Sequence, residues 1–370
     1  MSDLAFANKY RPKKMSDLVG QDHIVKILSN AILTDSLHHA YLFGGKFGCG
    51  KTSAARLLAA CVNNPGGSSL TPDESNPLVQ SIFEGKSIDV KEIDAASNRG
   101  IEDIRALKES ISFAPLESKY KFVIIDEAHR LTDAAAEAAL KMIEEPPPNV
   151  IFVLCTTDVH KLKETIYSRC QPLRFSKIAW DVIGQQLSKV AKNENLDIDE
   201  NAIKIAARLS KGSMRNALQN LQMMATLAGK QKITKELAEQ ALGAMDEGHF
   251  FVLVDAILKP DAGEAMRVID RILSDGRDIG DVLEGLVGHL RVLMLAKTCQ
   301  STSGLVYLTE AEKKRYEMQK NSIHLQLVVK MIELVGDINR AINLNMSPQV
   351  ALETFVVQSI IEGAYLKKSS

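Results

Sequence analysis

The first half of the chain alternates short apolar runs with longer stretches in which apolar residues recur every three or four positions. The short runs predict buried strands, and the longer periodicity predicts amphipathic helices. The predicted strands cover residues 40–43, 87–93, 121–125 and 150–156, and the predicted helices cover 52–61, 101–112 and 133–145. Repeated strand–helix units favour a parallel sheet flanked by helices, which is an α/β fold.

Local signals mark where some of these segments end. Thr132 is expected to cap the helix over 133–145, and Pro146 must stop it because proline cannot continue a helix. Between residues 62 and 87 the runs Asn-Pro-Gly-Gly-Ser-Ser and Thr-Pro-Asp-Glu-Ser favour turns over regular structure. This part is therefore predicted to be an irregular surface excursion.

Beyond about residue 177 only helical periodicity remains. The predicted helices fall into two groups, 180–192, 201–209 and 213–227, then 250–258, 262–274, 279–296, 325–341 and 347–364. A length of 370 residues fits two or three domains. We therefore expect an α/β domain over 1–177, a small all-α domain over 178–242 and a second all-α domain over 243–370.

Composition narrows the class of protein. With 45% hydrophobic and 25% charged residues the chain has the usage of a soluble globular protein, and no run approaches the roughly 18 apolar residues of a membrane span. No secretory signal is apparent, and the five cysteines form no C-x-x-C pair, which predicts a reduced, cytoplasmic location. A net charge of −1 means that any nucleic-acid binding must use a local patch.

The segment Gly45–Thr52 fits the pattern G-x-x-x-x-G-K-[ST] between a predicted strand and a predicted helix. Its glycines let backbone N–H groups converge on phosphate oxygens, and the helix presents its positive end to the same anion. Lys51 is expected to reach the β and γ phosphates, and Thr52 to hold Mg²⁺. The residues predicted here to line the nucleotide are Gly45, Lys46, Gly48, Cys49, Gly50, Lys51, Thr52 and Ser53.

Two acidic residues follow the apolar run Phe122–Ile125. Asp126 is expected to support the metal, directly or through water, and Glu127 to orient or deprotonate the attacking water. The alternative is that both are solvated turn acids. After the next predicted strand, Thr157 could contact the γ phosphate or the water, although ordinary β-propensity also explains a threonine there.

Two arginines are candidates for sensing or stabilising phosphate charge. Arg169 lies in Ser-Arg-Cys, far along the chain from the phosphate loop, and an arginine supplied from a neighbouring subunit would make hydrolysis depend on assembly. Arg215 follows Ser213, which could cap a helix, and Arg215 could sense phosphate from the small helical domain. A solvated surface arginine remains the alternative for each.

Together these motifs resemble the AAA+ ATPase subunits of sliding-clamp loaders, most nearly the gamma/tau subunits of the bacterial DNA polymerase III clamp loader. The resemblance is dense over roughly residues 5 to 225, and the C-terminal helices agree only in length and pattern. The matching segments are residues 9–12, 18–21, 38–43, 45–52, 92–97, 125–129, 144–147, 168–170 and 212–218.

The resemblance implies an ATP- and Mg²⁺-dependent machine that opens a ring-shaped clamp and closes it on primer–template DNA. It implies that Arg169 acts in trans, that Thr157 and Arg215 are the first and second sensors, and that residues 243–370 form a collar. It also implies an adenine seat that includes Tyr10, Arg11, Pro12 and Val19. The implied partners are further copies of the chain, delta-like and delta-prime-like subunits, the clamp and primed DNA.

In one respect the chain departs from the family. Relatives bind a structural zinc through four cysteines in the excursion after the phosphate-loop helix, and the matching residues here are Asn64, Asp73, Asn76 and Val79. Because structural zinc needs four thiolate or imidazole ligands, we expect no zinc. The chain also ends after the collar region, so we predict none of the helicase and polymerase contacts of longer relatives. A viral or organellar version of the family fits this divergence as well as a bacterial one.

DNA contact is expected to be limited to a few positions that face the phosphate backbone, because binding of this kind is largely independent of sequence. The candidates by resemblance are Arg99, Gly100, Arg105, Lys161 and Thr165. Solvated helix-face cations are the alternative. For the chain as a whole, the alternatives are another AAA+ DNA-remodelling motor and a subunit that binds nucleotide without hydrolysing it.

Overall fold

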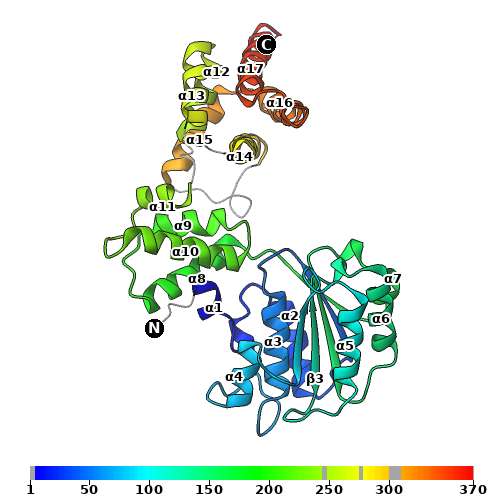
Figure 1. Ribbon diagram of the computed structural model, residues 1–370. Helices are drawn as coiled ribbons and strands as arrows, with labels where there is room; N and C mark the ends of the chain where they lie inside the picture. Colours follow the sequence, from blue (N-terminus) through cyan, green and yellow to red (C-terminus); the bar gives the residue numbers. More distant parts are fainter. Residues whose placement is uncertain (1–4, 244–247, 275–277, 300–309, 370) are drawn as a thin grey trace. The chain divides into compact units, whose positions relative to one another are not determined.

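The structure is a computed structural model that describes residues 5–243, 248–274, 278–299 and 310–369. The chain divides into two compact units, with the division between Leu242 and Gly243 (Figure 1). Each unit contains hydrophobic clusters of its own. Within the described ranges, no helix combines the length and the apolar character that crossing a membrane requires.

The first unit contains a five-stranded sheet and the helices around it. In chain order its elements are α1 (Phe6–Lys9), the 3-10 turn η1 (Met15–Asp17), α2 (Asp22–Leu33), β1 (Ala40–Gly45), α3 (Lys51–Val62), α4 (Pro77–Glu84), β2 (Val90–Asp94), α5 (Ile101–Ile111), β3 (Lys121–Asp126), η2 (Ala128–Arg130), α6 (Asp133–Glu144), β4 (Val150–Thr156), η3 (Val159–Lys161), α7 (Glu164–Tyr167), β5 (Gln171–Phe175), α8 (Trp180–Asn193), α9 (Glu200–Leu209), α10 (Met214–Ala228) and α11 (Lys235–Leu242).

The strands run parallel in the order β2-β3-β4-β1-β5. Side chains alternate between the two faces, as strand geometry requires. Helices α2 and α3 cover one face of the sheet, and α5 and α6 cover the other (Figure 1). Tyr41 and Phe43 pack with the first pair of helices, and Ala40 and Leu42 with the second. The predicted α/β fold, a helix-covered parallel sheet followed by helices, is therefore confirmed.

Several elements of this unit escaped the sequence analysis, among them α1, α2, α4, α7, α11 and β5. In strand β5 the buried Leu173 and Phe175 alternate with the exposed Pro172 and Arg174, so the sequence shows no continuous apolar run. It lies at the sheet edge, where proline is tolerated.

The region expected to be wholly irregular contains α4. Asn76 caps α4 by accepting from the Leu78 N–H at 2.9 Å, Pro77 begins it, and Val79 and Ile82 are buried.

The predicted strand over 87–93 begins later than expected, at Val90. Asp89, which is 1% exposed, has another use: its carboxylate accepts backbone N–H bonds from residues 116, 117 and 118. The predicted caps are confirmed, because Thr132 accepts from the Ala135 N–H and Ser213 accepts from the Asn216 N–H.

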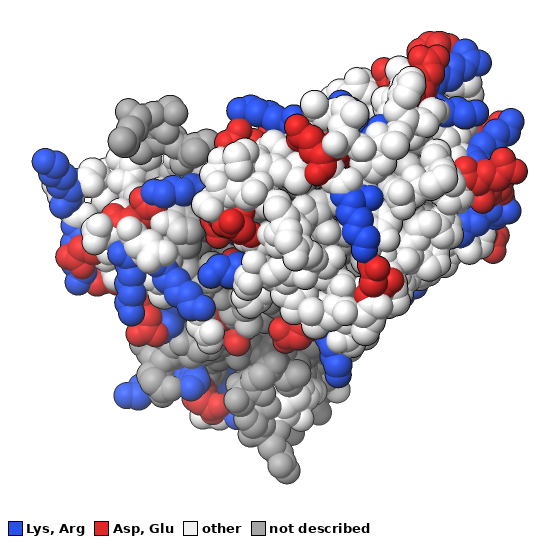
Figure 2. Space-filling model, turned by 90° about the horizontal axis from the view of Figure 1, so that it is seen from below, with Lys and Arg blue, Asp and Glu red and all other residues white. Residues whose placement is uncertain are grey.

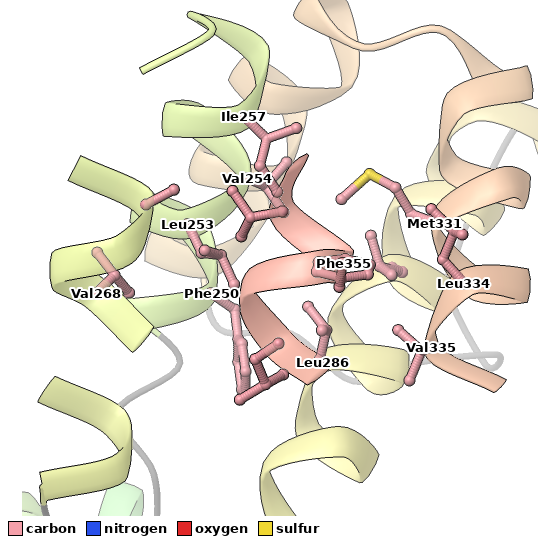
Figure 3. Packing of buried hydrophobic residues seen from close by; sticks show 14 of the residues in the cluster. Phe250, Leu253, Val254, Ile257, Val268, Leu286, Met331, Leu334, Val335 and Phe355 are labelled. Carbon is pink, nitrogen blue, oxygen red and sulfur yellow. The ribbon is translucent and has the colours of Figure 1, made fainter. Parts of the chain in front are cut away.

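The second unit is all-helical within its described residues. Its helices are α12 (Gly248–Leu258), α13 (Ala262–Ser274), α14 (Ile279–Thr298), α15 (Glu310–Ser322), α16 (Leu325–Asn343) and α17 (Pro348–Ser369). Apolar side chains such as Phe250, Leu286, Met331 and Phe355 converge on a shared core between these helices (Figure 3). The sequence analysis missed α15 because this helix is almost entirely polar.

A chain of buried polar groups joins α15 to α12 and α14. The Gln319 amide donates to Asp255 Oδ1 at 2.6 Å and to the Phe251 carbonyl at 2.9 Å, so Gln319 Oε1 faces His289 Nε2 as an acceptor, at 2.8 Å. His289 Nδ1 then accepts from the Tyr316 hydroxyl at 3.0 Å. This assignment makes His289 a neutral imidazole, and burial lowers its pKa from 6.5 to about 4.

We expect the second unit to lose stability as the solution is acidified. The unfolded chain takes up a proton near the ordinary pKa of 6.5, whereas folded His289, beside Gln319 and facing Arg315, resists protonation until about 4. The contribution is therefore present above about pH 6.5 and falls by about 2 kcal/mol by about pH 4.5. Urea unfolding at a series of pH values, monitored by hydrogen exchange of the α14 amides, measures this loss in the free energy of unfolding. The same slope in His289→Gln would contradict this explanation.

Candidate functional site

The carboxyl ends of the parallel strands meet at one edge of the sheet. Gly44 of β1 is paired with Thr156 of β4, and Asp94 of β2 with Asp126 of β3. Loops that leave this edge at neighbouring strands form the crevice in which open α/β sheets bind ligands. Most of the predicted chemistry is therefore brought together, although 74 residues separate Thr52 from Asp126.

The loop between β1 and α3 depends on glycine at two positions. Gly48 and Gly50 have φ angles of 73° and 102°, which side chains other than glycine rarely adopt. A Cβ atom at Gly48 would also lie 2.0 Å from Ser213 Oγ. The loop is therefore held close to the start of α10, and its backbone curves into a cradle followed by the N-terminus of α3.

Lys51 lies inside this cradle and is only 6% exposed. Its ammonium donates to the carbonyls of Gly45 and Lys46, at 2.9 and 3.0 Å. Both acceptors are neutral, and a phosphate oxygen would make a stronger, charge-assisted bond. The lysine is thus positioned to exchange these carbonyls for an anion.

Thr52 and Asp126 form the oxygen pair that the sequence analysis assigned to Mg²⁺. The Thr52 hydroxyl donates to Asp126 Oδ2 at 2.7 Å. Burial raises the pKa of the Asp126 carboxyl, and the hydrogen bonds from Thr52 and the Glu127 N–H oppose this rise. One hydroxyl and one carboxylate are hard oxygen donors, and Mg²⁺ typically uses few protein ligands beside water and phosphate, so the residues present fit this ion.

Glu127 is held on the side of β3 that faces β4. Its backbone is left-handed, with φ of 48°, and Glu127 Oε2 accepts from the Thr157 hydroxyl at 2.7 Å and from the Thr157 N–H at 3.3 Å. His129 Nδ1 lies 3.3 Å from the same oxygen and 2.9 Å from Thr156 Oγ1. The carboxylate that was predicted to act on water is therefore oriented by a threonine at the end of the next strand.

A cavity of about 240 Å³ lies above the loop within the first unit. The predicted residues that line it are Tyr10, Arg11, Pro12, Val19, Gly48, Cys49, Gly50, Lys51, Thr52, Ser53, Asp126, Glu127 and Arg215. Gly45 and Lys46 contribute instead through the carbonyls that hold Lys51. Thr157 contributes through Glu127.

Some residues that line the cavity were not named by the sequence analysis: Phe47, Glu92, Ile178, Gln186 and Met214. Phe47 lies inside the loop motif, and Glu92 and Met214 lie in segments that match the family, whereas Ile178 and Gln186 lie in no motif.

Gln21, 4% exposed, joins the loop to β5. It exchanges hydrogen bonds with the backbone of Ser176 at 2.8 and 3.1 Å and lies 3.5 Å from the Cys49 carbonyl.

Tyr10 and Arg11 enter the cavity from the N-terminal segment. The Tyr10 hydroxyl donates to Glu194 at the end of α8, and burial together with this carboxylate raises the pKa of Tyr10 to about 12. Burial lowers the pKa of the half-buried Arg11 guanidinium, and the charge of Arg56 adds to this effect. The tyrosine is therefore tied to the small helical part of the first unit.

Arg215 reaches the cavity from the second residue of α10. Its guanidinium carbon lies 5.3 Å from the centre of the Phe47 ring, a cation–π contact. The Met214 N–H donates to the Gly48 carbonyl at 3.0 Å. The helix that carries Arg215 is thus directly attached to the phosphate loop.

Arg169 is outside this cavity. It lies just after α7, and its side chain is 40% exposed. Its guanidinium contacts Glu144, the Thr165 carbonyl and Ser168.

The DNA candidates are spread along the surface rather than gathered in a pocket. Arg105 pairs with Glu102 and Lys161 with Asp158, while the backbone N–H of Gly100 donates to Asp103. Arg99 is exposed, and its carbonyl accepts from the Thr132 N–H at 3.1 Å. Basic and acidic side chains are interspersed on the face in Figure 2. The structure therefore leaves these five DNA contacts as predictions.

Three of the four positions that match the relatives' zinc ligands make side-chain hydrogen bonds to nearby backbone, and the fourth, Val79, is buried in α4. Asn64 Oδ1 accepts from the Asp73 N–H at 2.9 Å, Asp73 Oδ1 accepts from the N–H and hydroxyl of Ser75, and Asn76 caps α4. Among the described residues, no cluster of three or more His, Cys, Asp or Glu is arranged to hold a metal ion. The absence of zinc stays a prediction from residue type.

Comparisons with known proteins agree with this geometry. A family model described as "DNA polymerase III, delta subunit" matches residues 20–179, and one described as "DNA polymerase III subunits gamma and tau domain III" matches 233–360. The chain is 33% identical over 358 residues to DNA polymerase III subunit tau of Bacillus subtilis, covering 97% of this chain but 63% of that protein. It is 36% identical over 314 residues to DNA polymerase III subunit gamma of Buchnera aphidicola, covering 85% of this chain and 86% of that protein.

A structural comparison agrees at the level of the fold. A mutant of RuvB from Thermotoga maritima superimposes with a TM-score of 0.50 at 20% identity, covering 67% of this chain and 80% of that one. This similarity concerns the fold alone.

Proposed function

Because the chain belongs to the gamma/tau family of DNA polymerase III subunits, with an AAA+ ATPase fold, we propose that it is the ATP-hydrolysing subunit of a sliding-clamp loader. In this role ATP binding drives clamp opening and the binding of primer–template DNA. Hydrolysis then releases the closed clamp on DNA. The proposed location is the replication fork, in the cytoplasm.

One observation carries the proposal: the cradle, the metal-binding pair and the oriented carboxylate occupy one crevice. Lys51 lies within the loop, Thr52 bonds Asp126 at 2.7 Å, and Glu127 is held by Thr157 at 2.7 Å. A subunit that only binds nucleotide needs the loop, but it has no use for a positioned acid beside the metal-binding pair. The arrangement therefore favours turnover over a purely structural role.

The residues of this chain would divide the work as follows. Backbone N–H groups of the loop and Lys51 bind the phosphates, and Thr52 and Asp126 hold Mg²⁺, which when bound neutralises charge on the transferred phosphoryl group. Glu127 takes the proton of the attacking water, and Thr157 keeps its carboxylate oriented. Tyr10, Arg11, Pro12 and Val19 seat the base, and Arg215 senses the phosphates from α10.

The remaining proposals concern assembly. Arg169 is exposed and outside the cavity, which suits an arginine that completes a neighbouring subunit's site. Residues 1–177, 178–242 and 243–370 would act as nucleotide-binding domain, lid and collar. The proposed complex contains further copies of the chain, delta-like and delta-prime-like subunits, the clamp and primed DNA. The proposed contacts with the DNA backbone come from Arg99, Gly100, Arg105, Lys161 and Thr165.

ATP turnover by the reconstituted complex tests the proposal. We expect clamp and primed DNA together to raise turnover well above that of the isolated chain, and clamps to be retained on circular primed DNA. The control replaces primed DNA by double-stranded DNA without a primer. A rate of ATP hydrolysis that does not change when clamp and DNA are added would contradict the loader function. No hydrolysis, with ATP binding intact, would favour a non-hydrolysing structural subunit.

A further inference from the structure

Arg169 is held in place by its own subunit. Its Nε donates to Glu144 Oε1 at 2.6 Å, and its Nη1 contacts the Thr165 carbonyl at 3.0 Å and Ser168 Oγ at 3.2 Å. These partners come from two elements, because Glu144 is the last residue of α6 whereas Thr165 and Ser168 belong to α7 and its end. The guanidinium therefore bridges α6 and the segment that carries it.

The bonding pattern leaves one side of the guanidinium available. A guanidinium has five N–H donors in a rigid planar fork, and fixing Nε and Nη1 fixes the direction of Nη2. In the part of the chain that the structure describes, Nη2 has no hydrogen-bond partner. In a side chain that stays 40% exposed, Glu144 and the Nη1 contacts thus fix the plane of the guanidinium and leave the Nη2 donors for a further acceptor.

A second ion pair attaches the same segment to α6 at its other end. Lys163, which precedes α7, lies 3.0 Å from Asp133 and 3.5 Å from Glu137. An isolated exposed ion pair contributes little to stability, so removing either contact is expected to cost the fold little. The Lys163 ion pair and the Glu144 contact differ in what they can affect, because only the Glu144 contact involves Arg169.

Helix α6 also relates this arginine to the subunit's own site. It begins seven residues after Asp126 and ends at the Arg169 contact. Along the chain, the acids at the end of β3 are followed by the short η2 segment and then by α6.

We infer that Glu144 is a positioning residue that orients Arg169 for the active site of the neighbouring subunit. The inference rests on the proposed function, in which Arg169 acts in trans. The contact fixes the guanidinium before assembly, so the neighbouring site gains a pre-oriented cation. Without Glu144 the guanidinium keeps its Nη1 contacts to Thr165 and Ser168 but loses the bond that fixes Nε, so its orientation is less well defined.

The test separates the subunit that supplies the arginine from the subunit that hydrolyses. In a reconstituted complex with the partner subunits, Lys51→Ala serves as a donor that cannot turn over ATP, and Arg169→Ala serves as the acceptor. We expect Lys51→Ala/Glu144→Ala to lower the kcat of the mixture about 10- to 100-fold relative to Lys51→Ala, with KM for ATP unchanged. Lys51→Ala/Glu137→Ala, on the same helix, should match the Lys51→Ala donor.

Three outcomes would overturn the inference: equal kcat with and without Glu144, higher kcat without it, or an equal loss in the Glu137 control. As a second variant, Glu144→Gln retains an acceptor for Nε and should restore most of the lost kcat; no restoration would point to a fold defect and overturn the inference. If Lys51→Ala itself fails to complement Arg169→Ala, action in trans between copies fails, and the inference fails with it. Failure of the trans mechanism is seen with the Lys51→Ala donor alone, whereas failure of the Glu144 inference is seen only when the two donors are compared, so the two failures are distinguishable.

Discussion

Glu127→Gln is expected to lower ATP turnover by the assembled complex on the order of 10²- to 10⁴-fold while leaving ATP affinity nearly unchanged. The substitution keeps the size of the side chain and an oxygen that Thr157 can still contact, but it removes the carboxylate that accepts a proton. Lys51, Thr52 and Asp126, which hold phosphate and metal in the proposal, stay in place. Single-turnover hydrolysis and fluorescent-nucleotide binding, measured on the same preparation, separate the two effects.

Lys51→Ala is the companion variant to Glu127→Gln. It removes the ammonium held at 2.9 Å from the Gly45 carbonyl, so it should weaken nucleotide binding itself. Both variants should therefore lose ATP turnover, but only Lys51→Ala should also lose affinity for ATP. Turnover equal to that of the parent protein in either variant would favour a nucleotide-binding structural subunit over a hydrolysing one.

Arg169→Ala is expected to lower turnover in the complex about 10³- to 10⁵-fold, the range observed when a trans-acting arginine is removed from phosphoryl-transfer sites. Nucleotide affinity of the isolated chain should not change, because Arg169 is 40% exposed and does not line the cavity. Mixing Arg169→Ala with Lys51→Ala should restore part of the activity, since each variant supplies what the other lacks.

Arg105→Ala provides the matched control for Arg169→Ala. It too removes an exposed, ion-paired arginine of the first unit, 61% exposed beside Glu102. A small loss for Arg105→Ala, confined to DNA-stimulated turnover, is compatible with the proposed DNA contact. An Arg169→Ala complex as active as the parent complex would contradict the trans role.

Much of the site could be predicted because each part is encoded locally. The glycines at 48 and 50 adopt positive φ angles, and a lysine and a hydroxyl residue follow them at once, so the loop is recognisable from a few adjacent positions. Asp126 and Glu127 follow a short, β-branched apolar run that favours a buried strand. Parallel pairing then brings strand ends to one edge, which is why Thr157 could also be named.

Other parts carry no local signal. Glu144 stands in a run of acids and prolines, and nothing in the sequence indicates that it would contact Arg169, 25 residues further along the chain. Gln21 and Phe47 lie in recognisable segments. Their contact partners, Ser176 and Arg215, are distant in sequence and could not be read from those segments. Strand β5 was missed because an edge strand buries one face only, and α15 because it is mostly polar and joins its unit through His289 and Gln319.

The sequence by itself therefore determined the chemistry that is proposed: a phosphate loop, a pair of oxygen ligands for Mg²⁺, a carboxylate as general base, and arginines outside that loop. These depend on residue type and on contacts between near neighbours, which short stretches of chain specify. Only the tertiary structure decided which of them lie together, because the fold places Thr52 beside Asp126 and Arg169 beside Glu144. Such contacts are selected by packing of the whole unit, and no stretch of local sequence contains them.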